Sequence, residues 1–302
     1  MSLFLYAITV IIWGLTWFAI SLQLNTVPVE QSIAYRFGLA AAILFAFLIL
    51  TRKRLRLQKQ VHLRLVGQGV FLFSLNFIFF YFATDKIPSG LVSVIFSMAT
   101  ILNVINNRLF FKSQISPKAV IGGLMGLLGL GLLLVPTLES NSNLSEIAVG
   151  IVLAFCGTYC FSLGNMIGKW NATNNVNTVT ANAYAMLYGT LILLGFTIVS
   201  GQPFTFDYSI EYIGALLYLA IPGSVIGFTA YLTLVGRIGP EKAAYTTVLF
   251  PVIALGVSSV FEGYNWNGAA IAGLLIVFSG NIITFSPSSI FPKKLTHNTK
   301  PL

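Results

Sequence analysis

The sequence predicts an all-α integral membrane protein in which ten transmembrane helices form two inverted five-helix repeats. Charged residues make up 8% of the 302 residues and apolar residues 56%, whereas an ordinary soluble domain is about 25% charged. Most apolar stretches reach the roughly 20 residues that a helix needs to cross a bilayer. The third observation is an internal similarity at an offset of about 150 residues, half the length of the chain.

Ten apolar segments can be marked along the chain. Lipid offers no hydrogen bonds to backbone N–H and C=O groups, so each segment is expected to be a helix. The first one lacks the basic start and the small-residue cleavage site of a signal peptide, and we expect it to be retained. The segments are 3–22, 31–50, 65–83, 89–108, 118–135, 147–168, 178–200, 209–235, 242–261 and 267–285.

The basic residues predict the topology of these helices. All but two of the 17 Lys and Arg residues fall on one side of the membrane if the N-terminus is cytoplasmic. The exceptions are Lys86 in an outer loop and Arg36 inside the second segment. Cytoplasmic loops of membrane proteins carry an excess of Lys and Arg. We therefore expect a multi-pass protein of the cell (inner) membrane with both termini, including the tail 287–302, in the cytoplasm.

The internal similarity is clearest between residues 86–133 and residues 237–283. Each stretch opens with a basic residue, Lys86 or Arg237, and a turn that contains proline. An apolar helix, a short polar loop and a Gly-rich helix follow. Two helical hairpins can look alike by hydrophobicity alone, but this match includes turn chemistry and glycines.

The similarity predicts a first repeat over 1–137 and a second over 147–286. An odd number of helices in each repeat places the second copy upside down relative to the first. Inverted repeats are a common construction of secondary transporters, in which the substrate site forms near the bilayer midplane.

Several short motifs follow the order of a known family: Trp13-Gly14-Leu15-Thr16-Trp17, Tyr35-Arg36-Phe37, Leu249-Phe250-Pro251, Phe261-Glu262 and the helix Gly273–Gly280. With these motifs the chain resembles the drug/metabolite transporter superfamily, in particular its EamA-like branch of ten-helix exporters. The first repeat departs from the family pattern at Ala99-Thr100-Ile101, where proline is frequent, and at Lys112, where glutamate is frequent. The resemblance implies a metabolite or drug carrier, often an exporter of amino acids, and leaves the substrate open.

Aromatic and uncharged polar residues at membrane depth form the candidate substrate site. Trp13 and Trp17 share one helical face; they are either packing residues or, as the family resemblance implies, one wall of a cavity. The polar residues could each bond a neighbouring helix, but together they suit a neutral or zwitterionic solute. The candidates are Trp13, Trp17, Asn76, Phe80, Tyr81, Met98, Tyr159, Asn165, Phe228 and Tyr231. Pro251 is expected to loosen its helix because it removes a backbone donor.

Arg36 is the one strong charge inside a predicted helix. Two interpretations remain open. The side chain could extend to the outer interface or pair with Glu30, which is a structural role. Alternatively it could attract a carboxylate or phosphate of a solute.

Other polar and small residues favour structural roles. Asn103, Asn106 and Asn107 lie near a predicted helix end and are interpreted as solvated. Cys156 and Cys160 share an apolar helical face and are expected to be core residues. The small-residue faces, which allow helices to approach closely, are Gly122, Gly126 and Gly129 in the fifth segment and Gly268, Ala269, Ala272 and Gly273 in the tenth.

Several function classes are disfavoured by what the sequence lacks. The basic residues lie in short loops between helices, which argues against a nucleic-acid partner. No paired acids, Ser/His pair, metal-ligand motif or nucleotide-binding motif is visible, so we expect no enzyme, no primary pump, no metal and no cofactor. The leading hypothesis is a secondary carrier, monomeric or weakly oligomeric, that exports small metabolites such as amino acids by alternating access. Multidrug efflux is the alternative among carriers.

Overall fold

A computed structural model describes residues 2–24, 27–53, 55–115, 117–140, 143–243 and 246–285. Every regular element in these ranges is a helix. The elements are α1 (Ser2–Ser21), α2 (Val29–Leu50), α3 (Lys59–Val70), η1 (Phe71–Leu75), α4 (Asn76–Thr84), α5 (Ser89–Ser97), α6 (Ala99–Phe111), α7 (Pro117–Ser140), α8 (Leu144–Thr173), α9 (Thr178–Val199), α10 (Ile210–Tyr218), η2 (Leu219–Ile226), α11 (Gly227–Ile238), α12 (Pro240–Ala243), α13 (Thr246–Phe261) and α14 (Gly268–Phe285).

The helices follow the ten predicted apolar segments. In the described ranges, eight helical stretches are long and apolar enough to cross a membrane. The last two segments contain the shorter apolar helices Leu249–Phe261 and Gly268–Ile283. The all-helical prediction is therefore confirmed, and ten membrane crossings stay a prediction. The tail predicted at 287–302 lies outside the described residues.

Two of the long helical stretches contain π-helical turns. The turn η1 joins α3 to α4, and η2, which contains Pro222, joins α10 to α11. A π-helix bonds residues five apart instead of four, and π-turns are frequent at functional sites. A milder interruption at Met98 separates α5 from α6. The three interruptions lie in helices that surround the middle of the molecule.

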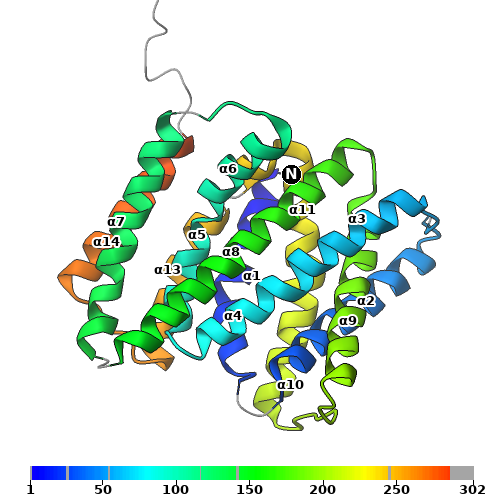
Figure 1. Cartoon of the computed structure of the whole chain (residues 1–302), viewed down its shortest axis with the longest axis horizontal. Helices are drawn as coiled ribbons and strands as arrows, with labels where there is room; N and C mark the ends of the chain where they lie inside the picture. The colour runs from blue at the N-terminus through cyan, green and yellow to red at the C-terminus, as the bar shows by residue number, and fades with distance from the viewer. Residues whose placement is uncertain are drawn as a thin grey trace, which may run out of the picture.

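The helices α7 and α14 form a tight pair at one edge of the molecule (Figure 1). A Cβ built on Gly273 would lie 2.6 Å from the carbonyl oxygen of Gly129, and one on Gly280 would lie 2.8 Å from that of Gly122. Such backbone-to-backbone contact requires glycine because any side chain would force the helices apart. The prediction that small residues pack helices is confirmed for Gly122, Gly129 and Gly273, whereas a Cβ built on Gly268 would have no neighbour within 4 Å, and the contact lies within the chain.

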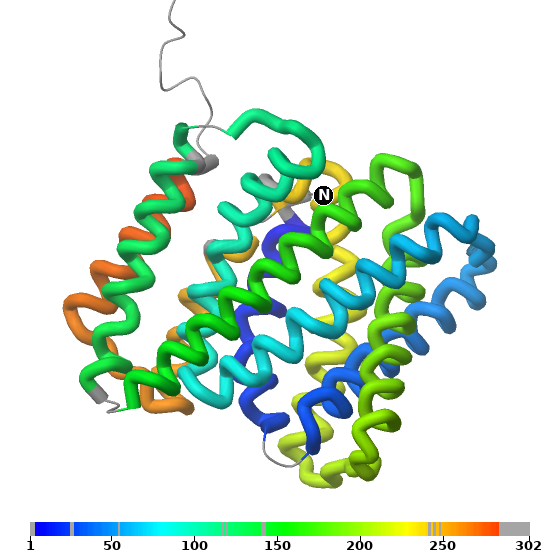
Figure 2. The backbone as a smooth tube through the Cα atoms, viewed as in Figure 1, coloured from blue at the N-terminus to red at the C-terminus, as the bar shows by residue number. Residues whose placement is uncertain are grey.

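Helix contacts elsewhere come in reciprocal pairs. The helix α1 packs on α13 and α6 packs on α8; likewise α4 packs on α8 and α1 on α11. The predicted repeats relate α1 to α8, α4 to α11 and α6 to α13. Exchanging the two repeats therefore turns the α1–α13 contact into the α8–α6 contact, and the α4–α8 contact into the α11–α1 contact. The inverted repeat itself stays a prediction. Figure 2 traces α1 through the middle of the molecule, which sets its side chains among the other helices.

Candidate functional site

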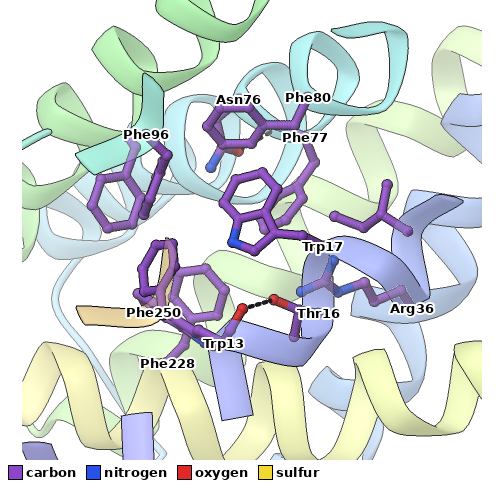
Figure 3. Close-up of a pocket in the computed structure, with 12 residues that line it drawn as sticks. Trp13, Thr16, Trp17, Arg36, Asn76, Phe77, Phe80, Phe96, Phe228 and Phe250 are labelled. Atoms are coloured by element: carbon purple, nitrogen blue, oxygen red, sulfur yellow. Dashed lines mark hydrogen bonds between the residues drawn. The ribbon is translucent and has the colours of Figure 1, made fainter. Parts of the chain in front are cut away.

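A small cavity lies at the centre of the helices, with walls from α1, α2, α4, α5, α8, α11 and α13 (Figure 3). The space in it available to the centres of water molecules is about 30 Å³, which is room for about two or three waters. The cavity is therefore contracted. Its 12 lining residues are Trp13, Thr16, Trp17, Ile20, Arg36, Asn76, Phe77, Phe80, Phe96, Phe161, Phe228 and Phe250.

Aromatic rings form most of the wall. The ring of Trp17 lies 5.2 Å from that of Phe80 and 5.4 Å from that of Phe96. The ring of Trp13 lies 4.9 Å from that of Phe228, and its Nε1 donates to the carbonyl oxygen of Gly223 at 3.1 Å. Ring centroids at 4.5–7 Å are the favourable range for edge and offset contacts. The indoles are thus fixed in position by their neighbours.

Gly227 allows Trp13 to take this position. A Cβ at residue 227 would overlap Nε1 of the Trp13 indole. Gly223 belongs to η2, and the π-helical winding there leaves its carbonyl oxygen available to the indole. Trp13 therefore provides one of the links between the first helix and the second half of the chain, and Tyr218, which donates to the carbonyl oxygen of Ile12 at 2.9 Å, provides another.

Arg36 is buried, with 1% of its surface exposed, and its guanidinium reaches the cavity beside Thr16 (Figure 3). Its Nε donates to the hydroxyl oxygen of Ser224 at 3.0 Å, and its Cζ lies 4.3 Å from the centre of the Phe77 ring. The second nitrogen, Nη1, has no hydrogen-bond partner in the described part of the chain. The interpretation that Arg36 extends to the outer interface is wrong, because the side chain points into the protein.

Two further donors in the cavity wall are buried without a partner among the described residues. These are Nε1 of Trp17 and Nδ2 of Asn76. The other amide atom of Asn76, Oδ1, accepts from the backbone N–H of Phe77 at 2.9 Å. A buried polar group without a partner costs about 1–3 kcal/mol. Unpartnered donors that line one cavity therefore point to a ligand rich in acceptors.

A network of amides closes the cavity toward the predicted cytoplasmic end. Nδ2 of Asn165 on α8 donates to the hydroxyl oxygen of Tyr231 at 2.9 Å and to Oδ1 of Asn103 at 3.4 Å. Asn106 donates to the hydroxyl oxygen of Ser162 at 2.9 Å. Since Asn103 and Asn106 are fully buried, the prediction of solvated helix-end residues is wrong for both.

The network continues along the same helices. Nζ of Lys169 on α8 donates to Oδ1 of Asn107 on α6 at 2.7 Å and lies 4.3 Å from the centre of the Phe111 ring. Asn107 is 5% exposed, so its prediction as a solvated residue is also wrong. The contacts between α6 and α8 thus change from neutral amides near the cavity to a charged group at the helix end.

A single carboxylate joins two helices toward the opposite, predicted outer end. Oε2 of Glu262, after the end of α13, accepts from the backbone N–H of Ser89 at 3.0 Å and from its hydroxyl at 2.8 Å. The hydroxyl of Ser258 donates to the same oxygen. Ser89 is the first residue of α5, where a negative charge is favourable because the helix dipole is positive. Glu262 therefore ties α13 to the start of α5.

The structure brings together only part of the predicted site. Trp13, Trp17, Asn76, Phe80 and Phe228 line the cavity. Asn165 and Tyr231 lie directly behind it, since the Tyr231 ring is 4.9 Å from that of Trp13. Pro251 is buried inside α13, next to the lining residue Phe250.

Three predicted residues do not line the cavity. Tyr81 lies behind its wall: it is buried, donates to Oε1 of Gln23 at 2.6 Å, and its hydroxyl interacts with the side chain of Arg36. Met98 faces an apolar groove between α6 and α7. Tyr159 is 41% exposed on the outside of α8, so a role in the central cavity is wrong for this residue. Phe161, two residues later, takes that place because it lies on the opposite face of the helix.

Sequence analysis missed several lining residues. Phe77 follows the predicted Asn76, and Thr16 and Phe250 belong to motifs that carry the family resemblance, so each had a signal. Ile20, Phe96 and Phe161 had none, because an apolar residue in an apolar helix carries no mark of the face it occupies.

Comparison with known proteins identifies the family. The model of the EamA-like transporter family matches residues 1–135 and 148–286. The uncharacterized inner membrane transporter YedA of Escherichia coli (strain K12) is 27% identical over 94% of this chain and 90% of its own. A probable amino-acid metabolite efflux pump of Salmonella typhimurium is 23% identical over 92% of each chain. A solved crystal structure with 19% identity, covering 94% of this chain and 96% of its own, has the same fold at a TM-score of 0.70. The chain is thus a membrane transporter that belongs to the EamA-like transporter family.

Proposed function

We propose that this protein is a secondary carrier that exports small metabolites, with amino acids as the leading class, through the central cavity. The observation that carries the proposal is the cavity wall itself. Tryptophan and phenylalanine rings offer apolar faces, while Arg36, Trp17 and Asn76 hold unpartnered donors. An amphipathic solute suits this combination of surfaces better than a wholly apolar one.

Alternating access is the proposed mechanism. The cavity is contracted and lies between one end held by Glu262 and another held by the asparagine network. A carrier must open these ends in turn so that the solute meets one side at a time. The reciprocal helix contacts support two inverted halves that rock against each other around the cavity. The topology with both termini cytoplasmic remains part of this proposal.

The printed name of one relative, a probable amino-acid metabolite efflux pump, supports the choice of substrate class. Multidrug efflux of lipophilic cations is the second candidate. It would be favoured by an acidic residue in the cavity wall, since buried acids attract cations. None of the 12 lining residues that the structure describes is acidic, and a buried cation, Arg36, lies among them. The amino-acid proposal is therefore preferred.

A transport assay tests the proposal directly. Purified protein in sealed proteoliposomes should catalyse counterflow of labelled amino acids and not of lipophilic cations. The variant Trp17→Ala should lose most of this flux, because the indole forms the centre of the cavity wall (Figure 3).

Trp266→Ala is the matched control. Trp266 is 38% exposed in the connection between α13 and α14, and its loss should leave the flux unchanged. Equal loss of flux in Trp17→Ala and Trp266→Ala would show that the cavity is not the transport site. Flux of cations in place of amino acids would favour multidrug efflux.

A further inference from the structure

We infer that the central cavity is a carboxylate site, in which the ligand's carboxylate binds Arg36 and its ammonium group, if present, is dispensable. The inference deepens the proposed function and rests on it, because it assigns the substrate class of the same cavity. Its basis is the set of buried side-chain groups in the cavity wall that have no partner in the described part of the chain, all of which are donors: Nη1 of Arg36, Nε1 of Trp17 and Nδ2 of Asn76.

The guanidinium is held in place before any ligand arrives. Nε is occupied by Ser224, whose own hydroxyl donates to the carbonyl oxygen of Leu219 at 2.7 Å. The plane also lies over the Phe77 ring, with Cζ 4.3 Å from its centre. Nη1 has no partner among the described residues, and the Arg36 side chain lines the cavity. Little side-chain entropy remains to be lost when an anion binds there, which favours tight binding.

The charge of Arg36 has no counterion among the residues that the structure describes. In the described part of the chain, the one ion pair joins Asp85 to Lys86, in the connection between α4 and α5. A buried charge without a partner is costly. A bound carboxylate would supply the missing charge and form charge-assisted hydrogen bonds, which are roughly twice as strong as neutral ones. A single arginine neutralises a single negative charge, so a monoanion fits best.

The described cavity wall offers an ammonium group no charged partner comparable to Arg36. The side-chain oxygens of its described lining residues are neutral, and each already makes one hydrogen bond: Oγ1 of Thr16 donates to the carbonyl oxygen of Trp13 at 2.8 Å, and Oδ1 of Asn76 accepts from Phe77. An ammonium group would find only the remaining lone pairs of these neutral oxygens and ring faces, where exposed cation–π contacts are worth about 0.5–1 kcal/mol. It would also lie in the same small cavity as the cation of Arg36. The carboxylate therefore determines recognition, and the aromatic rings favour a ligand whose other groups are apolar.

The size of the cavity adds a condition. Ligand pockets are typically about 300–1,000 Å³, whereas the space for water centres here is about 30 Å³. The carboxylate alone fits the contracted state, and an apolar tail requires the surrounding rings to separate. Binding should therefore select a wider conformation around a fixed Arg36.

The experiment measures binding to the purified full-length protein in detergent. Thermal stabilisation, followed by tryptophan fluorescence, reports on a ligand because a ligand that binds the folded state raises its stability. The probes share a phenyl ring and differ in charge: 3-phenylpropanoate, phenylalanine, phenylalaninamide, phenethylamine and phenyl phosphate.

We expect 3-phenylpropanoate and phenylalanine to bind with similar affinity. The amide and the amine should bind roughly tenfold or more weakly, as expected for loss of a charged hydrogen bond. Arg36→Gln should abolish this preference. Arg64→Gln is the matched control, since the Arg64 guanidinium lies over the Trp170 ring outside the cavity, and it should preserve the preference.

The probe series on the unaltered protein keeps the test valid if Arg36→Gln fails to fold. Equal binding of all five probes, or stronger binding of the amine, would overturn the inference. So would stronger binding of phenyl phosphate, which would assign a phosphate site instead. If amino-acid flux in proteoliposomes persists in any of these cases, the proposed carrier function stands alone; if flux and binding are both absent, the proposed function fails as well.

Discussion

The end of the cavity near Glu262 and the end near Lys169 are closed by different chemistry. At the first end, one carboxylate oxygen accepts the hydrogen bonds that join α13 to α5. At the second end, neutral side chains on α6, α8 and α11 share the closure, with Lys169 at its outer margin. The side-chain hydrogen bonds are therefore concentrated on one residue at the predicted outer end and distributed at the other.

This difference determines how each closure can fail. Removal of Glu262 leaves the N–H and hydroxyl of Ser89 and the hydroxyl of Ser258 without their acceptor at once. Removal of one asparagine leaves the other contacts of its network in place. A single substitution should therefore open the Glu262 end more easily than the other end.

One assay compares the two ends. A cysteine at Thr16, which lines the cavity, reports which side reaches it when a membrane-impermeant maleimide is added to sealed vesicles. The two free native cysteines, Cys156 and Cys160, are first replaced by alanine. Labelling from each side then measures the population open to that side.

Glu262→Ala should have the largest effect. Loss of the shared acceptor should cost the closed state about 2 kcal/mol, allowing for partial exposure of the carboxylate, which is roughly thirtyfold in population. Labelling of the Thr16→Cys variant should rise from the Glu262 side only. Glu262→Gln keeps an acceptor oxygen without the charge and should give a smaller rise. Unchanged labelling in Glu262→Ala would show that helix packing alone closes this end.

Asn165→Ala should have the next largest effect, in the opposite direction. The substitution leaves the buried Tyr231 hydroxyl and Oδ1 of Asn103 without their donor, at a cost of about 1–2 kcal/mol. Labelling should rise roughly tenfold from the Lys169 side. Asn174→Ala, at the exposed end of α8, is the control. An effect as large as that of Glu262→Ala would contradict the distributed closure.

Tyr231→Phe should have a moderate effect, because it removes one acceptor and preserves the ring beside Trp13. We expect about 1 kcal/mol, or roughly fivefold in labelling from the Lys169 side. Tyr159→Phe provides the comparison, since Tyr159 is exposed on the outer face of the same bundle. A larger effect from Tyr159→Phe than from Tyr231→Phe would return Tyr159 to the candidate site.

Lys169→Met should have the smallest effect. The substitution preserves an apolar contact with Phe111 and removes the hydrogen bond to Asn107. Because Lys169 is only partly buried, we expect about 0.5 kcal/mol or less, and a change in labelling of about twofold. A tenfold change would mean that the charge at this end controls the closure, which would make the two ends alike.

The sequence predicted the fold well because the membrane restricts it so strongly. Long apolar segments must become helices, and their boundaries are visible in the hydropathy of the chain. Within these segments the π-turns were not predicted. Pro222 in η2 marks a break in helical hydrogen bonding, but the contacts of this turn with Arg36 and Trp13 join residues far apart in the sequence.

The site was predicted less well because hydropathy gives the depth of a residue and not the face it occupies. Tyr159 and Phe161 lie two residues apart, and only the second lines the cavity. Arg36 was placed correctly in its helix, but its partner Ser224 lies 188 residues later. The asparagines of α6 were taken for solvated residues because a polar helix end has the same composition whether water or another helix surrounds it.

The contact between Ser224 and Arg36 gives the π-turn η2 a mechanical consequence. A residue advances about 100° around an α-helix, at 3.6 residues per turn. A π-turn accommodates one residue more than an α-helical turn. If η2 became α-helical, α10 would have to rotate by about that angle relative to α11. The rotation would withdraw the Ser224 hydroxyl from Nε of Arg36 and the Gly223 carbonyl from the Trp13 indole. A change in the winding of this short turn would then make or break the hydrogen bonds that hold Arg36 and Trp13 in the cavity wall.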